Sequence, residues 1–397
     1  MTATDRLDSP SRSLHLLTLT PFYPTRDDDA SGCFVSEPLT VLSKLGVVHS
    51  VLAVAPFYRK VGPLHPAAPP AQYARYVAVP GGWGLPSSGA LLFSALVRRV
   101  RALHHRMPID LIHAHGPLPA GHAALLLKRE LGLPFVVSVH GLDAYADRQV
   151  PGRPGEWCRR VSRLVFQSAD RVICISEHVR EQVLTGSPST KTGLVYNGAD
   201  PGLFRPAAEA IPLPPSGLQT IVSIGNLILI KGHDLLLRAL AVLSEKHSSL
   251  SCDIVGDGPL RENLEALAKD LGVNDRVRFL GRQSRREVAD LLRSATLFAL
   301  PSFYEGLGCV YLEAMATGKA VVGCRGQGIE EIIHHGRNGW LVVPNDVGDL
   351  TSGLATLLEN AELRARIAIE GRRTVLQSFT IERQAESLLR IYQECAS

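Results

Sequence analysis

The sequence predicts an α/β protein of two doubly wound, Rossmann-like domains that face each other across a cleft. Three observations support this fold class: short apolar runs alternate with helix-like segments, the alternation stops once at a proline-rich stretch, and it then restarts. Short, fully apolar strands that alternate with helices indicate parallel sheets covered on both faces. The chain has 397 residues, 45% of them apolar and 20% charged, which is enough for two globular cores.

The first set of strands lies in the N-terminal half of the chain. Strands are predicted for the apolar runs at 14–20, 49–55, 110–115, 135–140, 171–176 and 193–197. Helices are predicted between them, at 33–45, 119–131 and 177–185. These elements predict an N-terminal domain over residues 14–200, and the polar residues before it, 1–13, are predicted to be a disordered tail.

A linker separates this domain from a second set of strands. Residues 201–217 contain five prolines, which favour turns over regular elements. Strands are then predicted at 220–225, 251–256, 276–281, 296–301, 319–324 and 339–344. Helices are predicted at 233–247, 259–271, 285–294 and 309–317. The second domain is predicted to span 218–378, and residues 379–397 are predicted to form a C-terminal helix that crosses back to the N-terminal domain.

Charge and cysteine content limit the classes of partner. The net charge is +4, with 21 Lys+Arg against 15 Asp+Glu in residues 1–200 (net +6) and 21 against 23 in the remainder (net −2). This excess permits an anionic partner but is too diffuse to indicate nucleic-acid binding. The seven scattered cysteines contain no C-x-x-C pair, so neither a disulfide framework nor a zinc site is indicated.

The sequence also predicts where the protein resides. The N-terminus lacks the apolar segment of a signal peptide, and no run approaches the roughly 18 apolar residues of a membrane span. A cytoplasmic protein is therefore predicted. Residues 89–106 resemble an amphipathic helix with basic residues on one face. This helix is interpreted either as a core helix with a charged outer face or as a contact with anionic lipid at the inner face of the cell membrane.

The stretch EGLGCVYLEAMATGKAVV at 305–322 carries the strongest candidate site. Its glycines turn the chain directly after a predicted strand, and a helix is predicted to begin near Cys309. The free N–H groups and the dipole at a helix N-terminus attract anions. Glu305 and Glu313 would repel phosphate itself, but they suit the hydroxyl groups of a sugar or a ribose. The alternative interpretation is a glycine loop with two solvated acids.

This stretch resembles the E-x7-E signature of retaining glycosyltransferases of family 4, which have the GT-B fold. Further segments resemble the same family in the same order, and the similarity covers about residues 14–390. They are ADRVICIS and VYNGADPGLF within 169–204, SIGNLILIKGHDLLLRAL at 223–240, IVGDGPLRENLEALAKDLGVNDRVRFLG at 254–281 and GQGIEEIIHHGRNGWLVV at 326–343. The sequence is most similar to bacterial cell-envelope and polysaccharide-synthesising members.

The resemblance implies a site for the diphosphate of a nucleoside diphosphate sugar in the C-terminal domain. Lys231 would bind the diphosphate as a point charge; without the resemblance it reads as a surface lysine before a helix. Asn226 stands where the family usually has arginine, so one cationic contact to phosphate is missing. The remaining contacts would come from the backbone amides of Leu307, Gly308 and Cys309.

The resemblance also implies contacts to the sugar and the ribose. Glu305 would hold hydroxyls of the transferred sugar, and Glu313 would hold the ribose. His140, which ends the strand FVVSVH, would contact the transferred sugar from the N-terminal, acceptor-side domain; otherwise it is a hydrogen-bonded structural histidine. Gly32, in the loop DDDASGCF after the first strand, would lie close to the diphosphate and sugar.

Other polar residues near strand ends are less specific. Glu331 matches a family glutamate, with Glu330 in place of the usual proline, and both are alternatively exposed acids at a helix N-terminus. His113 and His115 lack a third ligand with metal-site spacing, so a structural or acceptor-side role is predicted. The acids at 27–29 contain a D-x-D, which is interpreted as a solvated loop rather than a metal site.

Together these features predict transfer of a sugar from a nucleoside diphosphate sugar to a hydroxyl, with retention of configuration. Glu305, His140 and Lys231 are the predicted catalytic residues, and neither a cofactor nor a metal is expected. The predicted acceptor is a sugar or a lipid-linked sugar in cell-envelope or exopolysaccharide synthesis. Two alternatives remain: an epimerase of the same fold and a non-catalytic donor-binding scaffold. A nicotinamide dehydrogenase is disfavoured because no G-x-G-x-x-G follows a predicted strand.

Overall fold

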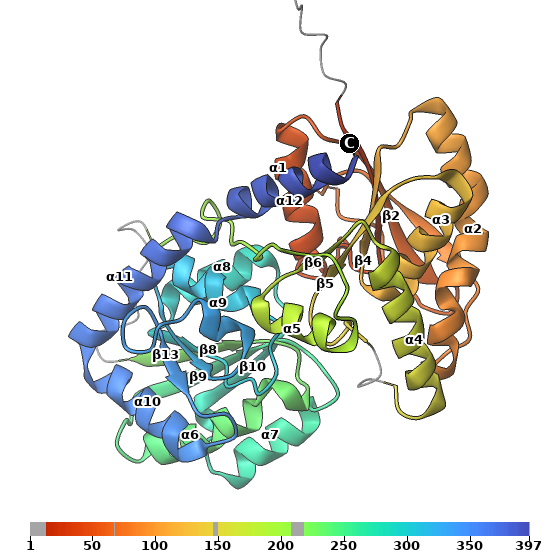
Figure 1. Cartoon of the computed structure of the whole chain (residues 1–397). Helices are drawn as coiled ribbons and strands as arrows, with labels where there is room; N and C mark the ends of the chain where they lie inside the picture. Colours follow the sequence, from red (N-terminus) through yellow and green to blue (C-terminus); the bar gives the residue numbers. More distant parts are fainter. Residues whose placement is uncertain (1–12, 67, 146–149, 208–217, 397) are drawn as a thin grey trace, which may run out of the picture.

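The computed structural model describes residues 13–66, 68–145, 150–207 and 218–396. Two parallel β-sheets, one in each half of the chain, are surrounded by helices and form two α/β units (Figure 1). The predicted fold class is therefore confirmed. Residues 1–12 of the predicted tail and 208–217 of the predicted linker lie outside the described residues.

The N-terminal sheet has the strand order β3-β2-β1-β4-β5-β6-β7, and each neighbouring pair is parallel. Its strands are β1 (His15–Thr20), β2 (Val48–Pro56), β3 (Ala71–Tyr76), β4 (Leu111–His115), β5 (Phe135–Val139), β6 (Arg171–Cys174) and β7 (Thr192–Leu194). One face is covered by α1 (Cys33–Lys44) and α12 (Ile381–Ala396). The other is covered by α2 (Leu85–Arg106), α3 (His122–Leu131) and α4 (Arg153–Ser168), and β6 leads into α5 (Glu177–Gly186).

The C-terminal sheet has the order β10-β9-β8-β11-β12-β13 and is also parallel. Its strands are β8 (Gln219–Ile224), β9 (Leu250–Val255), β10 (Val277–Gly281), β11 (Leu297–Ala299), β12 (Ala320–Cys324) and β13 (Trp340–Val342). Its helices are α6 (His233–Ser244), α7 (Arg261–Asp270), α8 (Arg285–Ser294), α9 (Cys309–Ala316), α10 (Val347–Glu359) and α11 (Ala361–Ser378). Short helical turns occur at Gly82–Gly84, Pro117–Gly121, Leu229–Lys231, Asn274–Arg276 and Gly328–Glu331.

The inner strands are apolar on both faces because successive side chains point to opposite sides of a sheet. Leu16 packs toward α1 and α12, whereas Leu17 belongs to the core under α2, α3 and α4. The edge strand β3 differs, because only Ala74 and Tyr76 among its side chains are buried. The sequence does not predict β3, since its alternating polar residues break the apolar run.

Helices α4, α10 and α11 also lie outside the elements that the sequence predicts. In α4, Cys158, Val161 and Val165 are buried at helical spacing, but four arginines interrupt the apolar pattern. The C-terminal helix is expected to cross back, and α12 does so, lying beside α1 (Figure 1). Its Leu388 and Tyr392 pack in the same core as side chains of α1. The last helix of the chain therefore completes the N-terminal unit.

Each sheet has a switch point, where the connections from one strand lead to neighbours on both of its sides. In the N-terminal sheet β1 lies between β2 and β4, and in the C-terminal sheet β8 lies between β9 and β11. Ligands of doubly wound sheets bind at the carboxyl ends of strands near such points. Gly32 follows β1, Asn226 follows β8 and Glu305 follows β11, so three predicted site residues lie at these positions.

Helix α2 confirms the predicted amphipathic segment at 89–106 and extends it to Leu85. On its apolar face Leu92, Leu96 and Val100 are buried in the core, and Phe93, Val97 and Leu103 are partly buried against it. The interpretation as a core helix with a charged outer face is therefore the one that the packing supports. Within the described ranges, no helix combines the length and the apolar character that crossing a membrane requires.

Candidate active site

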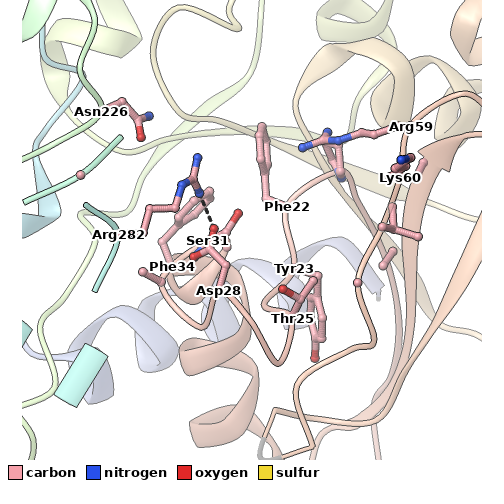
Figure 2. A pocket seen from close by; sticks show the side chains of 18 of the residues that line it. Phe22, Tyr23, Thr25, Asp28, Ser31, Phe34, Arg59, Lys60, Asn226 and Arg282 are labelled. Carbon is pink, nitrogen blue, oxygen red and sulfur yellow. Dashed lines mark hydrogen bonds and ion pairs between the residues drawn. The ribbon is translucent and has the colours of Figure 1, made fainter. Parts of the chain in front are cut away.

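A cavity of about 670 Å³ lies between the two units (Figure 2). Its N-terminal wall comes from the segments after β1 and β2 and includes Phe22, Tyr23, Gly32, Arg59 and Lys60. Its C-terminal wall comes from the segments after β8, β9 and β10 and includes Gly225, Asn226, Gly256, Arg282 and Gln283. The carboxyl ends of both sheets thus open into one space. Of the predicted site residues, Gly32 and Asn226 line this cavity.

Gly32 is required by the backbone that surrounds it. It caps the N-terminus of α1 with a φ of 78°, a conformation that favours glycine. A Cβ at this position would lie 2.5 Å from the carbonyl carbon of Phe22 and from the amide nitrogen of Tyr23. Only a glycine lets α1 begin this close to the end of β1, so the α1 N-terminus faces the cavity.

Lys231 and Glu305 are brought together from distant parts of the C-terminal unit. The Lys231 ammonium is 2.5 Å from a carboxylate oxygen of Glu305, and the two side chains are 17% and 13% exposed. The stem of Lys231 packs against Gly225, which lines the cavity next to Asn226. The pair therefore lies immediately behind the cavity wall. A diphosphate in the cavity would compete with Glu305 for the Lys231 charge.

The loop that carries Glu305 is held by the N-terminal unit. A Cβ on Gly306 would be 2.7 Å from the His140 carbonyl oxygen, so the two backbones touch. The Ser176 hydroxyl donates a hydrogen bond of 2.6 Å to the Gly306 carbonyl. Leu307 is buried, and Gly308 has a φ of 86° at the N-cap of α9. The structure thus brings His140 next to the Glu305 loop.

The N-terminus of α9 also contacts the N-terminal unit. The Asn197 amide donates a hydrogen bond of 3.1 Å to the Cys309 sulfur. The first turn of a helix has N–H groups without partners inside the helix, which is why an anion binds there. The amides of Leu307, Gly308 and Cys309 therefore remain candidates for a phosphate contact.

His140 lies behind the aromatic wall of the cavity rather than in it. Its ring is 4.8 Å from that of Phe34 and 6.1 Å from that of Phe22, both of which line the cavity. Its Nε2 is 3.1 Å from Nδ1 of His115, and the two rings are nearly parallel. Burial lowers the pKa of His140 to about 4, so its ring is neutral at pH 7.

His113 extends this cluster to the C-terminal helix. Its Nε2 is 2.7 Å from the Ser138 hydroxyl, and its Nδ1 is 2.8 Å from the hydroxyl of Tyr392 in α12. Burial lowers its pKa to about 3. These contacts support the structural role predicted for His113 and His115. In the part of the chain that the structure describes, no three His, Cys, Asp or Glu side chains are grouped so that they could hold a metal ion.

Glu313 faces an arginine that the sequence does not single out. Its carboxylate is buried and forms an ion pair with Arg285 at the start of α8. Arg285 also bonds Glu37 of α1, at 2.8 Å, so it links the two units. Burial raises the pKa of Glu37 to about 7, although Arg285 opposes this shift. The predicted contact of Glu313 with a ribose would require Arg285 to share this carboxylate.

The acidic loop at 27–29 is a domain contact through Asp28 and Asp29, so its interpretation as a solvated loop is wrong for these two acids, whereas Asp27 is exposed. Asp28 forms an ion pair with Arg282 across the cavity (Figure 2). The Asp29 carboxylate accepts a hydrogen bond of 3.0 Å from the backbone N–H of Arg285. Because α8 begins at Arg285, this acid lies at its positive end. Arg282 and Arg285 follow β10. Their position directly after a predicted strand is the sequence feature that could have marked them as residues of the site.

Glu331 likewise joins the two units and is not an exposed acid. Its carboxylate accepts hydrogen bonds of 2.8 and 2.7 Å from the N–H groups of Glu177 and His178 at the start of α5. The Tyr196 hydroxyl donates a third bond, of 2.9 Å. Glu330 instead bonds the backbone N–H of Gly326 within its own loop. Glu331 therefore fixes the position of α5 against the C-terminal unit.

Comparison with known proteins identifies the family. The model described as Glycosyltransferase Family 4 matches residues 40–203, and the model described as Glycosyl transferases group 1 matches 205–374. D-inositol 3-phosphate glycosyltransferase 2 of Catenulispora acidiphila is 31% identical over 383 residues, which is 89% of this chain and 88% of that protein.

Solved structures show the same fold. Sucrose-phosphate synthase from Thermosynechococcus elongatus superposes with a TM-score of 0.78 at 22% identity, covering 96% of this chain and 98% of that one. The Anabaena protein Alr3699/HepE, solved in complex with UDP and glucose, has a TM-score of 0.74 at 20% identity, covering 96% and 100%. The chain belongs to glycosyltransferase family 4 and is a glycosyltransferase with the GT-B fold.

Proposed function

We propose that this glycosyltransferase moves a sugar from a nucleoside diphosphate sugar to a hydroxyl acceptor, with retention of configuration and without a metal ion. The observation that carries the proposal is the Lys231–Glu305 ion pair directly behind the wall of the interdomain cavity. A cation and a sugar-binding acid at the carboxyl ends of two strands suit a diphosphate and its attached sugar. The Anabaena relative in complex with UDP and glucose supports this choice of donor.

In the proposed reaction the acceptor oxygen forms a bond to the anomeric carbon while the bond to the diphosphate oxygen breaks. The acceptor proton leaves with the diphosphate. Negative charge grows on the leaving group, and preorganised charges and N–H groups aimed at it are the expected main contribution to rate. Lys231, Asn226 and the N-terminus of α9 supply these groups, and Lys231 makes a metal ion unnecessary.

Glu305 and His140 are proposed to act on the sugar. Glu305 accepts hydrogen bonds from sugar hydroxyls once the diphosphate takes over Lys231. His140 presents a neutral ring from the opposite unit. Its Nδ1 is buried behind the aromatic wall and has no partner among the described residues, so a sugar hydroxyl that passes this wall would meet an unpaired nitrogen. Retention follows from the family resemblance, with attack on the same face as the leaving group.

The test begins with binding and ends with turnover. A thermal-shift screen against nucleoside diphosphates and their sugars identifies the donor, because binding raises the unfolding temperature. Turnover with an acceptor panel, followed by NMR of the anomeric proton, then shows transfer and its stereochemistry. Release of an isomerised donor in the absence of acceptor would show that the protein is an epimerase. Binding of the donor without any turnover would show that it is a non-catalytic donor-binding scaffold. Loss of turnover in EDTA, restored by magnesium, would overturn metal independence.

We further propose a cytoplasmic enzyme that acts in cell-envelope or exopolysaccharide synthesis, on a sugar or a lipid-linked sugar, at the anionic inner face of the membrane. Support comes from the basic outer face of α2. Arg99 and Arg101 are bonded to the side chains of Gln72 and Glu130. Arg98 and Arg106 are exposed, and Arg106 bonds only the backbone carbonyl of Ala102, so these two arginines keep their charge for lipid.

Sedimentation with anionic liposomes tests this membrane contact. Wild-type protein is expected to pellet at low salt and not at high salt, because each basic residue near an anionic surface contributes about 1 kcal/mol. The variant Arg98→Glu/Arg106→Glu should stay in solution at both. Equal partitioning of the two proteins would show that α2 makes no membrane contact.

A further inference from the structure

We propose that the acceptor is anionic, and that its phosphate or carboxylate binds Arg59 and Lys60 on the N-terminal wall of the cavity. This inference rests on the proposed transfer reaction and names the chemical class of its second substrate. The structure suggests it because cations lie on both sides of the cavity. On the C-terminal side Lys231 lies directly behind the wall, and on the N-terminal side Arg59 and Lys60 line the cavity itself.

Arg59 and Lys60 belong to a loop that the structure holds in place. The loop follows β2, and the Arg75 guanidinium donates hydrogen bonds of 2.8 and 2.9 Å to the carbonyls of Phe57 and Arg59. The Tyr73 hydroxyl donates a bond of 2.7 Å to the carbonyl of Gly62 at the other end of the loop. The loop backbone is thus tied to β3 on both sides of the two cations.

The two side chains are directed to the cavity and not to a protein acid. Both line it, and the Arg59 side chain extends from its loop toward Phe22 (Figure 2). Across the described ranges, neither side chain forms an ion pair or a side-chain hydrogen bond. Arg75, by contrast, bonds the loop backbone and does not line the cavity, so the cations that a ligand in the cavity meets on this side are Arg59 and Lys60.

The charge of the cavity lining favours an anion. The basic residues that line it are Arg59, Lys60 and Arg282, and Asp27 approaches the loop at Gly62 without lining the cavity. Among the described residues that line the cavity, the one carboxylate is Asp28, and Arg282 already neutralises it. A cleft lined by one sign of charge concentrates ligands of the opposite sign. The N-terminal wall therefore selects for an acceptor with negative charge.

The same cations are poorly placed to serve the donor. The diphosphate contacts proposed above come from β8, β11 and α9 of the C-terminal unit. Arg59 and Lys60 come from the N-terminal unit, on the other side of the cavity from Asn226 (Figure 2). An anionic group held there leaves the rest of the acceptor to reach across to the donor sugar. An arginine fork and a lysine point charge together suit phosphate best.

The experiment compares matched acceptors in the full-length enzyme with the donor found by the binding screen. Glucose, glucose 6-phosphate and glucuronate serve as a neutral acceptor, an acceptor with a phosphate and an acceptor with a carboxylate. A polyprenyl diphosphate-linked sugar in detergent separates a lipid-borne anion from a soluble one. We expect kcat/KM to be at least about tenfold higher for an anionic acceptor than for its neutral counterpart, the ratio that about 1.4 kcal/mol of binding provides.

The variant Arg59→Gln/Lys60→Gln should raise the KM for the anionic acceptor at least about tenfold. It should leave turnover of the neutral acceptor and nucleoside diphosphate binding unchanged. The control, Arg98→Gln/Arg106→Gln, removes the same charge from the outer face of α2 and should leave all these quantities unchanged for soluble acceptors. Equal use of neutral and anionic acceptors by the wild type, or an equal loss for both in the double variant, would overturn the proposal.

A binding measurement keeps this test independent of turnover. Calorimetric titration of glucose 6-phosphate into protein saturated with nucleoside diphosphate should give heat with the wild type and none with the double variant. Absence of binding to the wild type would refute the anionic-acceptor site even if transfer occurs. Conversely, binding that is lost in the double variant, together with no turnover for any acceptor, would leave the anion site intact and reject the transfer reaction.

Discussion

Lys231 and Glu305 are two charges that hold each other in a part-buried position behind the cavity wall. A ligand phosphate can replace Glu305 as the partner of Lys231, and a sugar hydroxyl can replace Lys231 as the partner of Glu305. The pair is therefore both a structural contact and a preformed site. The Glu305 loop owes its position to Gly306, which allows the His140 carbonyl to approach it.

The first prediction concerns these two charges. Glu305→Gln and Lys231→Ala should each lower kcat at least about 100-fold, the scale for removing one electrostatic contact to a transition state. Lys231→Ala should also weaken nucleoside diphosphate binding in the thermal-shift assay. Lys246→Ala removes an exposed lysine from the same unit and is the control. Turnover within a few fold of the wild type in both site variants would remove the pair from the mechanism.

The second prediction concerns the hydrogen bond between His115 and His140. If His115 donates through Nδ1, His140 must carry its own proton on Nδ1, the nitrogen without a partner. His115 is thus a positioning residue that makes His140 a donor to the sugar. His115→Phe should lower kcat about tenfold, the value of one hydrogen bond of about 1.4 kcal/mol.

His115→Asn should restore much of that activity, because an asparagine amide places an N–H near the position of Nδ1. Steady-state kinetics together with the unfolding temperature check this. If the Phe and Asn variants are equally impaired, or if both lose activity only in proportion to lost stability, His115 merely fills space.

Helix α5 shows how an element of one unit is fixed by a residue of the other. Its first N–H groups would lack partners, and the Glu331 carboxylate accepts two of them together with the Tyr196 hydroxyl. A negative charge at a helix N-terminus is also favourable for the helix dipole. Glu331 therefore belongs to the domain interface, whereas the sequence alone left it either as a match to a family glutamate or as an exposed acid at a helix N-terminus.

The third prediction follows from this cap. Glu331→Ala leaves three donors unpaired and should lower the free energy of unfolding by about 3 kcal/mol, since hydrogen bonds to charged groups contribute about 1.5–3 kcal/mol each and some are replaced by water. Tyr196→Phe removes one of the three and should cost about a third as much. Urea unfolding measures both. An Ala variant as stable as the wild type would show that water satisfies α5 equally well.

The whole molecule is closed across its cleft by charged contacts between the units. Arg282 pairs with Asp28, and Arg285 pairs with Glu37 while it also holds Glu313. Helix α12 adds an apolar contact, because Tyr392 packs under α1 and reaches His113. The cavity is therefore framed by both units and by the last helix of the chain.

The fourth prediction concerns stability against acid. Burial lowers the pKa of seven histidines: His49, His140 and His233 to about 4, His113 to about 3, His115 well below its usual value, and His122 and His335 by less. In the unfolded chain these rings take up protons near pH 6.5, whereas the folded rings stay neutral. The unfolded state then binds more protons, so stability is complete above about pH 6.5 and falls as the pH decreases toward 4.

Two carboxyls act in the opposite direction. Burial raises the pKa of Glu37 to about 7 and that of Asp143 to about 6, so the folded state gains protons there first. Seven histidines outweigh two carboxyls, and the unfolding temperature is expected to be lower at pH 5.0 than at pH 7.5 by circular dichroism. His49→Leu, which lies outside the site, should reduce the difference. An unfolding temperature that is equal or higher at pH 5.0 would contradict the assignment of these buried neutral rings.

The sequence by itself determined the two α/β units, nearly all of their inner strands, and the segments that carry Gly32, Asn226, Lys231 and Glu305. Apolar periodicity is local, and a ligand site at strand ends follows from topology, so both can be inferred from the chain. The edge strand β3 and helix α4 were not predicted, because polar residues interrupt the apolar pattern of each.

Only the tertiary structure decided which charges meet. Arg285 reaches Glu37 and Glu313, Asp28 reaches Arg282, and Glu331 caps α5, although up to 254 positions separate such partners along the chain. Each of these acids has the sequence appearance of a solvated side chain. The interaction of two charges depends on their distance and on how far water is excluded, and neither quantity exists until the two units close on each other.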